Sequence, residues 1–422
     1  MWTKTITASA VTCLCVLSAQ AQETPAWKIS GFGTAAATYF TRSDADFTGG
    51  SGAVPDGAGR TKPVSLEPDS KAGLQVRYTP TQALELTLQA ISKHNPKDTW
   101  TPTLEWANVK YTFNENFALR VGRIGHPFFM ISDYRQVNYT NTALRPSQEV
   151  YNQVPMSASD VIEGLFRFSM GGGQLGVRAG IGRIDADATA TLPTERDHDL
   201  IRVRDMGFLN LNYEIDALTI RAGYTQGNIT YDALGAQRRL FDPLSAIPSA
   251  TARAVRDRYR ISNAKSSFSG IGAIYDPGDY IISTEYVMLR SEKGYNNADA
   301  WTILGGYRVG QFTPYISYGS AKARNRILTD GVAAELTPIV GPTSAARLQA
   351  GLQAYADASL HDQNTISVGV RWDFYKNLAL KAQFDHVNVK SPSPSGFLRN
   401  TSSSYPATGG GNVLAVALDF IF

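Results

Sequence analysis

The feature that most constrains this chain is an alternation, with a period of two residues, of large apolar side chains with small or polar ones. It is clearest in the last eleven residues, Asn412 to Phe422. One face of that segment is large and apolar, made of Leu414, Val416, Leu418, Phe420 and Phe422. The other face carries Ala415, Ala417, Asp419 and Ile421. Successive side chains of a strand point to opposite faces, so the pattern predicts a strand whose apolar face meets lipid.

Similar segments recur along the chain, and each is close to the roughly 9–11 residues that a tilted strand needs to cross a bilayer. The expected strands are Lys28–Phe40, Ser70–Tyr78, Ala83–His94, Leu104–Phe113, Phe117–Gly125, Val161–Met170, Gly173–Ile184, Arg204–Ile215, Leu218–Thr230, Phe268–Asp276, Tyr280–Arg290, Ala298–Val309, Phe312–Ala323, Thr365–Tyr375, Leu378–Val389 and Asn412–Phe422. They predict an all-β fold, a transmembrane antiparallel β-barrel of about 16 strands, with a range of about 14 to 18 left open. Lipid offers no partner to a free sheet edge, so the sheet must close on itself.

The connections between these segments alternate between short and long. Short turns rich in Gly, Asn, Asp and Pro, such as Lys376–Asn377, suit hairpins. The long connections are Thr41–Asp69, Asn95–Thr103, His126–Asp160, Asp185–Val203, Tyr231–Ser267, Ser291–Asn297, Arg324–Asn364 and Lys390–Gly411. This alternation predicts short periplasmic turns, long extracellular loops and both chain termini on the periplasmic side.

Residues 1–21 have the pattern of a cleaved secretory signal peptide, because an apolar stretch ends at the small-residue cleavage site Ala19-Gln20-Ala21. Residues 22–422 would then form the barrel in the outer membrane. Both cysteines of the chain, Cys13 and Cys15, lie in the signal. The mature chain would therefore have no disulfide, no thiolate catalysis and no Cys-ligated zinc.

The charge balance and the histidine spacing argue against a nucleic-acid partner and a metal site. Without Lys4 of the signal, 39 of the 40 Lys and Arg residues remain against 37 Asp and Glu. Such a balance provides no footprint for nucleic acid. The five histidines are scattered, with no metal-ligand spacing. We therefore expect no nucleic-acid partner, no metal and no cofactor.

The face opposite the apolar one carries many charges. By parity, the charged residues expected to line the lumen are Arg77, Glu85, Glu163, Arg167, Arg178, Arg221, Glu285, Arg308, Arg371, Asp373, Lys381 and Asp385. A lumen with so many charges must hold water, because unpaired charges are too costly to bury in a dry core. Basic groups are in slight excess, so we expect at most a mild preference for anions.

The third long connection is unusually apolar for a loop. Its range 127–160 contains Phe128, Phe129, Met130, Ile131, Tyr134, Tyr139 and Tyr151. We expect it to fold into the barrel, where this surface can be buried, and so to narrow the pore. Its charged residues would then face passing solutes, and these are Asp133, Arg135, Arg145 and Glu149. Opposed charges across such a constriction set the selectivity of a channel.

A signal, about 16 strands, the terminal Phe422 and a long loop after the fifth strand together resemble the Gram-negative general porins. The segment Leu119-Arg-Val-Gly-Arg123 is similar to the Gly-Arg step that leads into the constriction loop of porins. The resemblance implies that Asp133 and Glu149 face a basic wall, for which the candidates are Lys110, Arg120 and Arg123. It also implies a homotrimer, inserted by the barrel-insertion machinery through Phe422.

The sequence departs from the porin pattern in two places. The loop lacks the usual Pro-Glu-Phe-Gly-Gly tract, and the second long connection, Asn95–Thr103, is short for a trimer latch. By parity, Arg123 belongs to the lipid side with Val121. It would reach the lumen only where Gly122 or Gly125 breaks the alternation.

Two further motifs have ordinary structural explanations. Gly31-Phe-Gly33-Thr-Ala-Ala36 imitates a dinucleotide-binding fingerprint, but it lies inside an expected strand, so close packing explains its small residues better. The connection Tyr231–Ser267 is basic through Arg238, Arg239, Arg253, Arg256, Arg258 and Arg260. We favour a solvated loop that bridges anionic lipopolysaccharide over one that recruits anions at the pore mouth.

Three functional hypotheses follow from these observations. The first is a porin that admits small hydrophilic solutes and ions by passive diffusion, without enzymatic activity. The second is a substrate-selective channel with an anion preference, which would show an aromatic slide or a dense basic ladder along the lumen. The third is a non-conducting barrel, an adhesin or an enzyme, with the loop as a plug.

Overall fold

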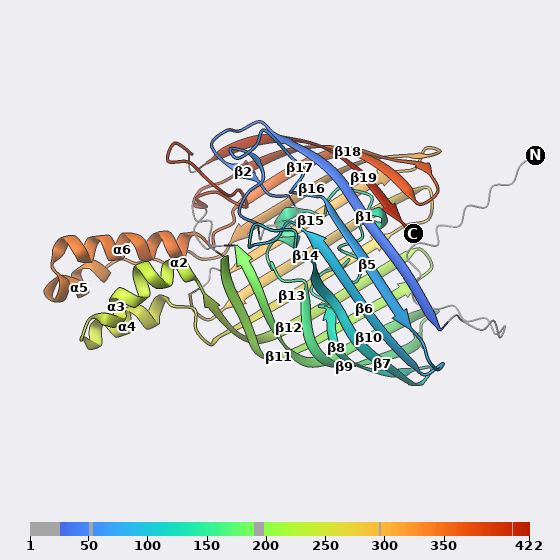
Figure 1. Cartoon of the computed structure of the whole chain (residues 1–422), viewed down its shortest axis with the longest axis horizontal. Helices are drawn as coiled ribbons and strands as arrows, with labels where there is room; N and C mark the ends of the chain where they lie inside the picture. Colours follow the sequence, from blue (N-terminus) through green and yellow to red (C-terminus); the bar gives the residue numbers. More distant parts are fainter. Residues whose placement is uncertain (1–25, 50–53, 190–197, 295–296, 407) are drawn as a thin grey trace, which may run out of the picture.

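The computed structural model describes residues 26–49, 54–189, 198–294, 297–406 and 408–422. Its body is a closed antiparallel barrel of 16 strands (Figure 1). Each barrel strand pairs with the next along the chain, and the last, β19 (Gly409–Ile421), pairs back onto the first, β1 (Trp27–Phe40). The predicted fold class is confirmed. The predicted signal peptide lies outside the described residues.

All sixteen segments that the alternation predicted are strands of the barrel. Those between β1 and β19 are β5 (Lys71–Tyr78), β6 (Leu84–Lys93), β7 (Thr103–Asn114), β8 (Phe117–Gly125), β9 (Ala158–Met170), β10 (Gly173–Thr189), β11 (His198–Ile215), β12 (Leu218–Asp232), β13 (Ala264–Tyr275), β14 (Tyr280–Ser291), β15 (Ala298–Tyr307), β16 (Phe312–Ala323), β17 (Gln363–Tyr375) and β18 (Leu378–Val389). Several strands, including β10 and β11, run further than predicted at the end that carries the long connections.

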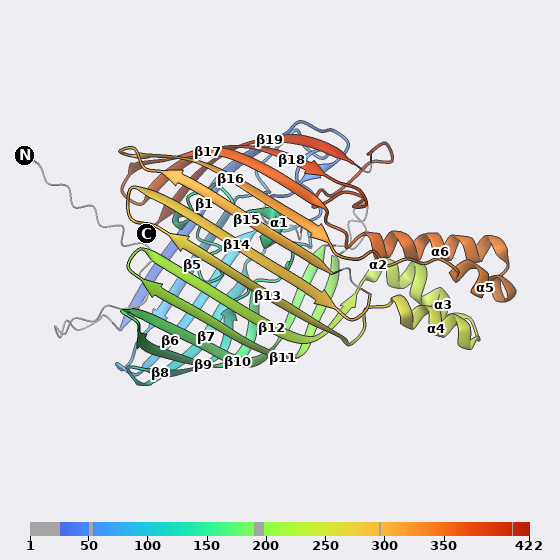
Figure 2. The same ribbon diagram turned by 180° about the vertical axis from the view of Figure 1, so that it is seen from behind.

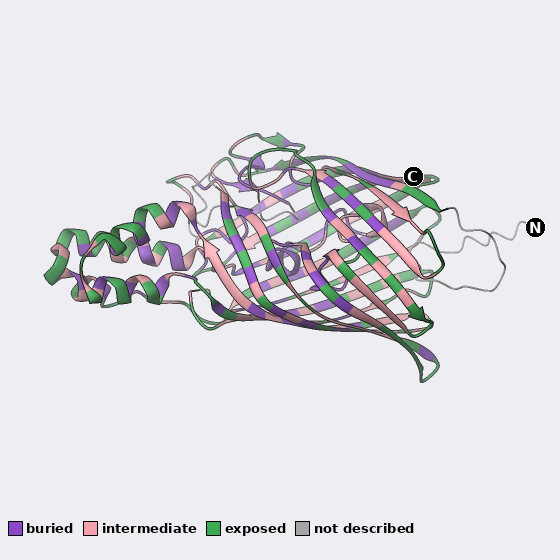
Figure 3. Cartoon of the chain, turned by 60° about the horizontal axis from the view of Figure 1, so that its bottom comes forward, coloured by how far each residue is buried: buried purple, intermediate pink, exposed green. Residues whose placement is uncertain are grey.

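The alternation along each strand is also visible in burial. On β19, Leu414 and Val416 are about half exposed, whereas Ala417 and Asp419 are fully buried. Figure 3 shows a similar alternation of exposed, intermediate and buried residues along the strands of the barrel. The outward face is therefore a belt of large apolar side chains, as a lipid-facing surface requires.

The two ends of the barrel differ. Trp27 pairs with Tyr78 beside one short turn, and Ile421 donates its backbone N–H to Asn377 in another. The start of β1 and the end of β19 therefore both lie at the end of the barrel that carries the short turns. The long connections lie at the opposite end, which carries a helical extension (Figures 1 and 2). This arrangement is the one that the alternation of short and long connections predicts.

The helical extension is a feature that the sequence analysis missed, because it treated these connections as solvated loops. One part lies between β12 and β13 and consists of α2 (Leu234–Ala236), the π-helix η2 (Gln237–Phe241), α3 (Asp242–Ala246) and α4 (Ala250–Tyr259). The other lies between β16 and β17 and consists of α5 (Val332–Val340) and α6 (Pro342–Asp357). Their shared core includes Phe241, Leu244, Val255, Leu336 and Leu352. No helix in the described ranges combines the length and apolarity needed to cross a bilayer.

The arginines of this extension are not one free basic loop. Arg258 on α4 pairs with Glu335 on α5 at 2.9 Å, which joins the two connections. Arg256 pairs with the neighbouring Asp257 at 2.7 Å, and Arg260 lies 3.8 Å from Asp232 at the end of β12. The extension therefore neutralises part of the charge that appears as a basic run in the sequence.

The glycine motif of β1 serves packing. A Cβ atom on Gly33 would lie 2.4 Å from the ring of Phe420, and one on Gly31 would lie 2.3 Å from the ring of Phe422. The small residues thus leave room for two aromatic rings across the β1–β19 seam. No dinucleotide site is needed to explain them.

Gly122 on β8 has a backbone conformation that only glycine adopts readily. Its φ is +124°, and a Cβ atom would lie 2.3 Å from the carbonyl oxygen of Ala107 on the paired strand β7. Any other residue at position 122 would strain this backbone conformation and would also clash with the backbone of β7.

We expect Gly122→Ala to lower the free energy of unfolding of the barrel by about 1–3 kcal/mol. Gly305→Ala on β15 is the matched control, because an added Cβ meets nothing within 4 Å there. Urea unfolding of the refolded protein in lipid vesicles measures both. Equal unfolding midpoints for the two variants would contradict the strain at Gly122.

Candidate functional site: the loop inside the barrel

Residues 126–157 connect β8 to β9 and lie within the barrel, and we call this segment the inner loop. It contains the 3-10 helix η1 (Asn138–Thr140) and the short helix α1 (Gln148–Tyr151). Helix α1 lies against β14 to β17, and η1 lies against β1 and β19. Figure 2 shows α1 within the ring of strands. The inner loop therefore crosses the interior from the strand that it leaves to the seam of the barrel.

Apolar contacts bury the first and last parts of the inner loop. Phe128 and Phe129 each meet the ring of Phe268 on β13 edge-on, at centroid distances of 5.4 and 5.2 Å. Val150, Tyr151 and Val154 belong to the same buried cluster. The aromatic residues that make this connection unusual in sequence thus pack against the inner wall. Burial of such rings stabilises each by a few kcal/mol, which favours the inward course of the loop.

Asp133 of the inner loop is held by arginines of the wall. Its carboxylate lies 2.8 Å from Arg178 on β10 and 3.2 Å from Arg221 on β12. Arg178 also lies 3.1 Å from Glu163 on β9, and Glu163 accepts a hydrogen bond from Arg120 on β8 at 2.6 Å. Burial would raise the pKa of Asp133, but Arg178 and Arg221 outweigh it and hold that pKa well below its ordinary value.

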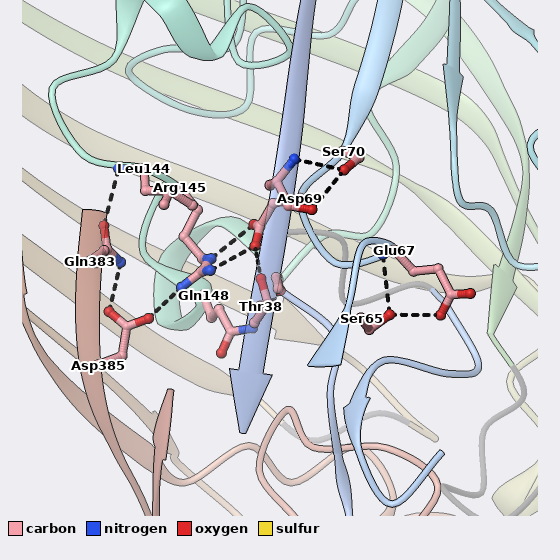
Figure 4. Close-up of polar contacts among 12 residues, drawn as sticks. Thr38, Ser65, Glu67, Asp69, Ser70, Leu144, Arg145, Gln148, Gln383 and Asp385 are labelled. Atoms are coloured by element: carbon pink, nitrogen blue, oxygen red, sulfur yellow. Dashed lines mark hydrogen bonds and ion pairs between the residues drawn. The ribbon is translucent and has the colours of Figure 1, made fainter. Parts of the chain in front are cut away.

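Arg145 sits between two carboxylates that approach from opposite sides (Figure 4). It donates two hydrogen bonds to Asp69, at 2.8 and 2.6 Å, and a third to Asp385 on β18. All three side chains are at most 4% exposed. The backbone N–H of the preceding residue, Leu144, donates to the side-chain oxygen of Gln383 on β18 at 3.1 Å. This group fixes the middle of the inner loop to the first connection and to β18.

Two cations of the wall bind backbone carbonyls of the inner loop. Lys381 on β18 donates to the carbonyl oxygens of Asn138 and Asn141 at 2.7 and 2.6 Å, and it lies 2.9 Å from Asp419. Arg371 on β17 donates to the carbonyl oxygens of Tyr139 and Asn141 at 2.6 and 3.0 Å. Both cations therefore bind the inner loop, and their hydrogen bonds stabilise its position in the barrel.

Two glutamates complete the attachment. Glu285 on β14 accepts from the backbone N–H of Met130 at 2.7 Å and from the hydroxyl of Tyr151 at 2.6 Å. Glu149 of the inner loop accepts from Gln363 on β17 at 2.8 Å. The predicted loop acids thus contact wall residues on different strands, and only Asp133 faces arginines.

The remaining residues predicted for the lumen lie nearer the short-turn end. Glu85 on β6 lies 3.2 Å from Lys110 and 3.6 Å from Arg77. Arg308 pairs with Asp276 at 2.6 Å beside a short turn, and Asp373 pairs with Arg371 at 2.7 Å. Arg167 is exposed, and its backbone N–H donates to Asn116 in the turn before β8.

Arg123 does not join the basic wall. Its guanidinium makes two hydrogen bonds to Asp160 on β9, at 2.8 and 3.0 Å. It shares the outward face of β8 with the exposed Val121, whereas Ile124 beside it is fully buried. The unusual backbone of Gly122 leaves the alternation intact, so the suggestion that Arg123 turns inward is wrong. The wall candidates that face the lumen are Lys110 and Arg120.

The inner loop covers the charges of the lumen unevenly. On β18 and β19, Lys381 and Asp419 are both 0% exposed. On β5 to β7, the side chains of Arg77, Glu85 and Lys110 are 32%, 23% and 30% exposed. Arg308 and Asp373 are partly exposed as well, whereas Thr87, Gln89 and Asn108, further along β6 and β7, are buried. The partly exposed charges therefore lie nearer the short-turn end, and three of them belong to β5 to β7.

Two lysines on the inner face of β5 and β6 were not singled out from the sequence. Lys71 on β5 and Lys93 on β6 are direct cross-strand neighbours. Both line a small cavity together with Arg135 of the inner loop. Parity could have found them, because Lys71 shares the face of Gln75 and Arg77, and Lys93 that of Glu85.

In the described part of the chain, no group of three or more His, Cys, Asp or Glu residues is arranged to hold a metal ion. His126, at the start of the inner loop, is instead part of the packing. Its ring nitrogens lie 2.9 Å from the hydroxyl of Ser159 and 3.0 Å from that of Thr225. Burial, with the charges of Arg178 and Arg221, lowers the pKa of His126 to about 3.

Neither a protein-family model nor a curated protein matches this chain. Solved structures do. The anion-selective porin from Comamonas acidovorans is 13% identical and has a TM-score of 0.53, with 94% of this chain and 99% of that chain covered. OmpF of Salmonella typhi, solved with daunomycin, is 13% identical with a TM-score of 0.51, covering 94% and 97%. The outer-membrane channel DcaP of Acinetobacter baumannii is 12% identical with a TM-score of 0.51, also covering 94% and 97%.

These similarities extend over nearly the whole of each chain, at identities that show the fold alone. The closed barrel of 16 strands is the fold of these outer-membrane porins.

Arg145→Ala should leave Asp69 and Asp385 buried without their shared cation. Loss of one partner of a buried ion pair typically costs 3–5 kcal/mol, so we expect a loss of about that size in the free energy of unfolding. Arg308→Ala is the control, because its pair with Asp276 is partly exposed and should contribute at most about 1 kcal/mol. Urea unfolding in vesicles compares the two. A milder effect of Arg145→Ala than of Arg308→Ala would refute the central role of Arg145.

The buried His126 should make the barrel less stable in acid. In the unfolded chain a histidine titrates near pH 6.5, whereas the pKa of folded His126 is about 3. Below pH 6.5 only the unfolded chain takes up this proton, so stability falls with a slope approaching roughly 1.4 kcal/mol per pH unit until about pH 3. We expect His126→Gln to remove this component in urea unfolding between pH 4 and 7. An unchanged slope in His126→Gln would contradict this role of the buried imidazole.

Proposed function

We propose that this protein is an outer-membrane porin, a water-filled channel through which small hydrophilic solutes and ions diffuse passively. The observation that carries the proposal is the uneven cover of the lumen. The inner loop buries Lys381 and Asp419 on β18 and β19, while Arg77, Glu85 and Lys110 on β5 to β7 stay partly exposed. Partly exposed charges inside a barrel need water around them, so a wet path along this wall is the natural consequence.

The proposal includes the setting of the channel. A cleaved signal would deliver the chain to the outer membrane, where the barrel-insertion machinery would recognise Phe422 and where the extension would meet lipopolysaccharide. We also propose a homotrimer. The porin fold supports it, and OmpT of Vibrio cholerae, with a TM-score of 0.51 and 13% identity, is described in a trimer form. Diffusion through such a channel involves no chemical step.

A second candidate function, a channel selective for anions, is favoured by the charges on the inner face of β1 and β5 to β7. From the short-turn end upward, the inward positions of β1 and β5 to β7 carry five cations: Lys28, Arg77, Lys110, Lys71 and Lys93. The carboxylates of the same wall are Glu85 and Glu105. This is the basic ladder that distinguishes a selective channel from a general one. The anion-selective porin from Comamonas acidovorans has the same fold, at an identity too low to transfer its selectivity.

The position of the channel can be tested with single cysteines, because the only two natural ones, Cys13 and Cys15, lie in the predicted signal. Gln75 and Leu74 are neighbours on β5, the first inward and the second outward by parity. In planar bilayers we expect ohmic single-channel conductance, and we expect a cationic thiol reagent to reduce it in Gln75→Cys but not in Leu74→Cys. Barrels that insert but do not conduct would support the non-conducting alternative instead.

A further inference from the structure

The lysines at 71 and 93 form an arrangement that is unfavourable without a ligand. They face each other directly on adjacent antiparallel strands, on the lumen side. Like charges in this position destabilise a sheet. Lys71 donates one hydrogen bond to the side-chain oxygen of Asn138 at 3.1 Å. Among the described residues, Lys93 has no carboxylate within the 4.0 Å of an ion pair.

A third cation reaches the same place from the inner loop. The guanidinium of Arg135 donates one hydrogen bond, to the carbonyl oxygen of Tyr151 at 2.7 Å. It is stacked near the rings of Phe129 and Tyr151, at 5.3 and 5.5 Å from their centroids. These contacts fix the orientation of the guanidinium but leave most of its N–H groups without a described partner. Arg135, Lys71 and Lys93 therefore present donors to one cavity.

Four carboxylates interact electrostatically with these cations, and none of them forms an ion pair with one of the three among the described residues. Asp419 pairs with Lys381 at 2.9 Å, and Glu285 accepts hydrogen bonds from Met130 and Tyr151. Asp69 lines the cavity, but Arg145 occupies both of its carboxylate oxygens and it is only 5% exposed. Glu105 on β7 faces Lys93 and Arg135 electrostatically, yet it lies beyond ion-pair distance of both and is 7% exposed. The three cations are each partly exposed. A solute that enters the cavity thus meets cations first.

We propose that Lys71, Lys93 and Arg135 form a binding site for a small oxyanion with two negative charges, such as inorganic phosphate or a short dicarboxylate. Two lysines supply point charges and the arginine supplies a planar pair of donors, a combination that matches the oxygens of such an anion. The bound anion would also relieve the repulsion between the lysines. The proposal rests on the proposed channel function and gives it a substrate class.

The site differs from the other basic groups around the inner loop because, among the described residues, its three cations have no carboxylate within ion-pair distance. The other cations that the inner loop contacts are paired, as Arg145 is with Asp69 and Lys381 is with Asp419. A site inside a channel must also release its ligand, so binding in the millimolar range is appropriate. Lys110 lies on the same wall, but Glu85 engages it at 3.2 Å. It therefore provides a matched control.

The test measures chloride conductance in planar bilayers while inorganic phosphate or succinate is added. In the wild type we expect a saturable decrease, with half-saturation at millimolar concentration. Lys93→Gln and Lys71→Gln should each raise the concentration for half-saturation about tenfold or more. Lys93→Arg, which keeps the positive charge, should have a value close to that of the wild type. Lys110→Gln should keep the wild-type value. Block by only one of the two probes would identify the ligand as phosphate-like or carboxylate-like. Equal block in wild type and Lys93→Gln, or no block in the wild type, would overturn the site.

A second measurement separates this site from the channel. Phosphate should raise the urea midpoint of the wild type but not that of Lys93→Gln. Without phosphate, Lys93→Gln should be at least as stable as the wild type, since it removes a repulsion. Phosphate stabilisation in a protein that does not conduct would refute the channel and keep the site. Conductance without any phosphate effect would refute the site and keep the channel.

Discussion

The rest of this structure depends on the pairing of its first and last strands. A bilayer offers no hydrogen-bond partner to a sheet edge, so a chain that crosses with strands must join its ends. The β1–β19 ladder does so from Phe32 opposite Ile421 to Phe40 opposite Val413. Glycines 31 and 33 let the rings of Phe422 and Phe420 lie flat across this seam. Closure also creates an interior, and the alternation of the strands sends every second side chain into it.

The inner loop decides what that interior becomes. Its aromatic residues pack against the wall, and two of its charges, Asp133 and Arg145, pair with wall residues of β10, β12 and β18. Six of the twelve charged residues predicted for the lumen therefore hold the loop in place: Arg178, Arg221, Glu285, Arg371, Lys381 and Asp385. In the proposed channel, solutes would meet the charges that stay partly exposed, among them Arg77, Glu85 and Lys110 on β5 to β7. In the proposed channel, selectivity would follow from the position of the loop as much as from the number of charges.

The strands were predictable because lipid imposes a two-residue pattern on each of them, and all sixteen were found in this way. Inward charges were predictable for the same reason. Their pairing was not, since Arg145 joins Asp69 and Asp385 across 76 and 240 residues. Arg123 shows that parity outweighs a short motif, because it stays outward despite its resemblance to a pore residue. The helical extension escaped detection because its segments carry no two-residue pattern imposed by lipid, and their core forms only when two distant connections meet.

The charges of the inner loop have a consequence for how the proposed channel would respond to voltage. Between residues 126 and 157, Asp133 and Glu149 balance Arg135 and Arg145, and His126 is neutral, so the formal charge of the segment is zero. A membrane potential acts on a moving segment in proportion to its net charge, at about 2.3 kcal/mol per elementary charge for 100 mV. Displacement of this loop as a unit would carry no gating charge. In the proposed channel, a membrane potential would therefore exert no net force on this loop.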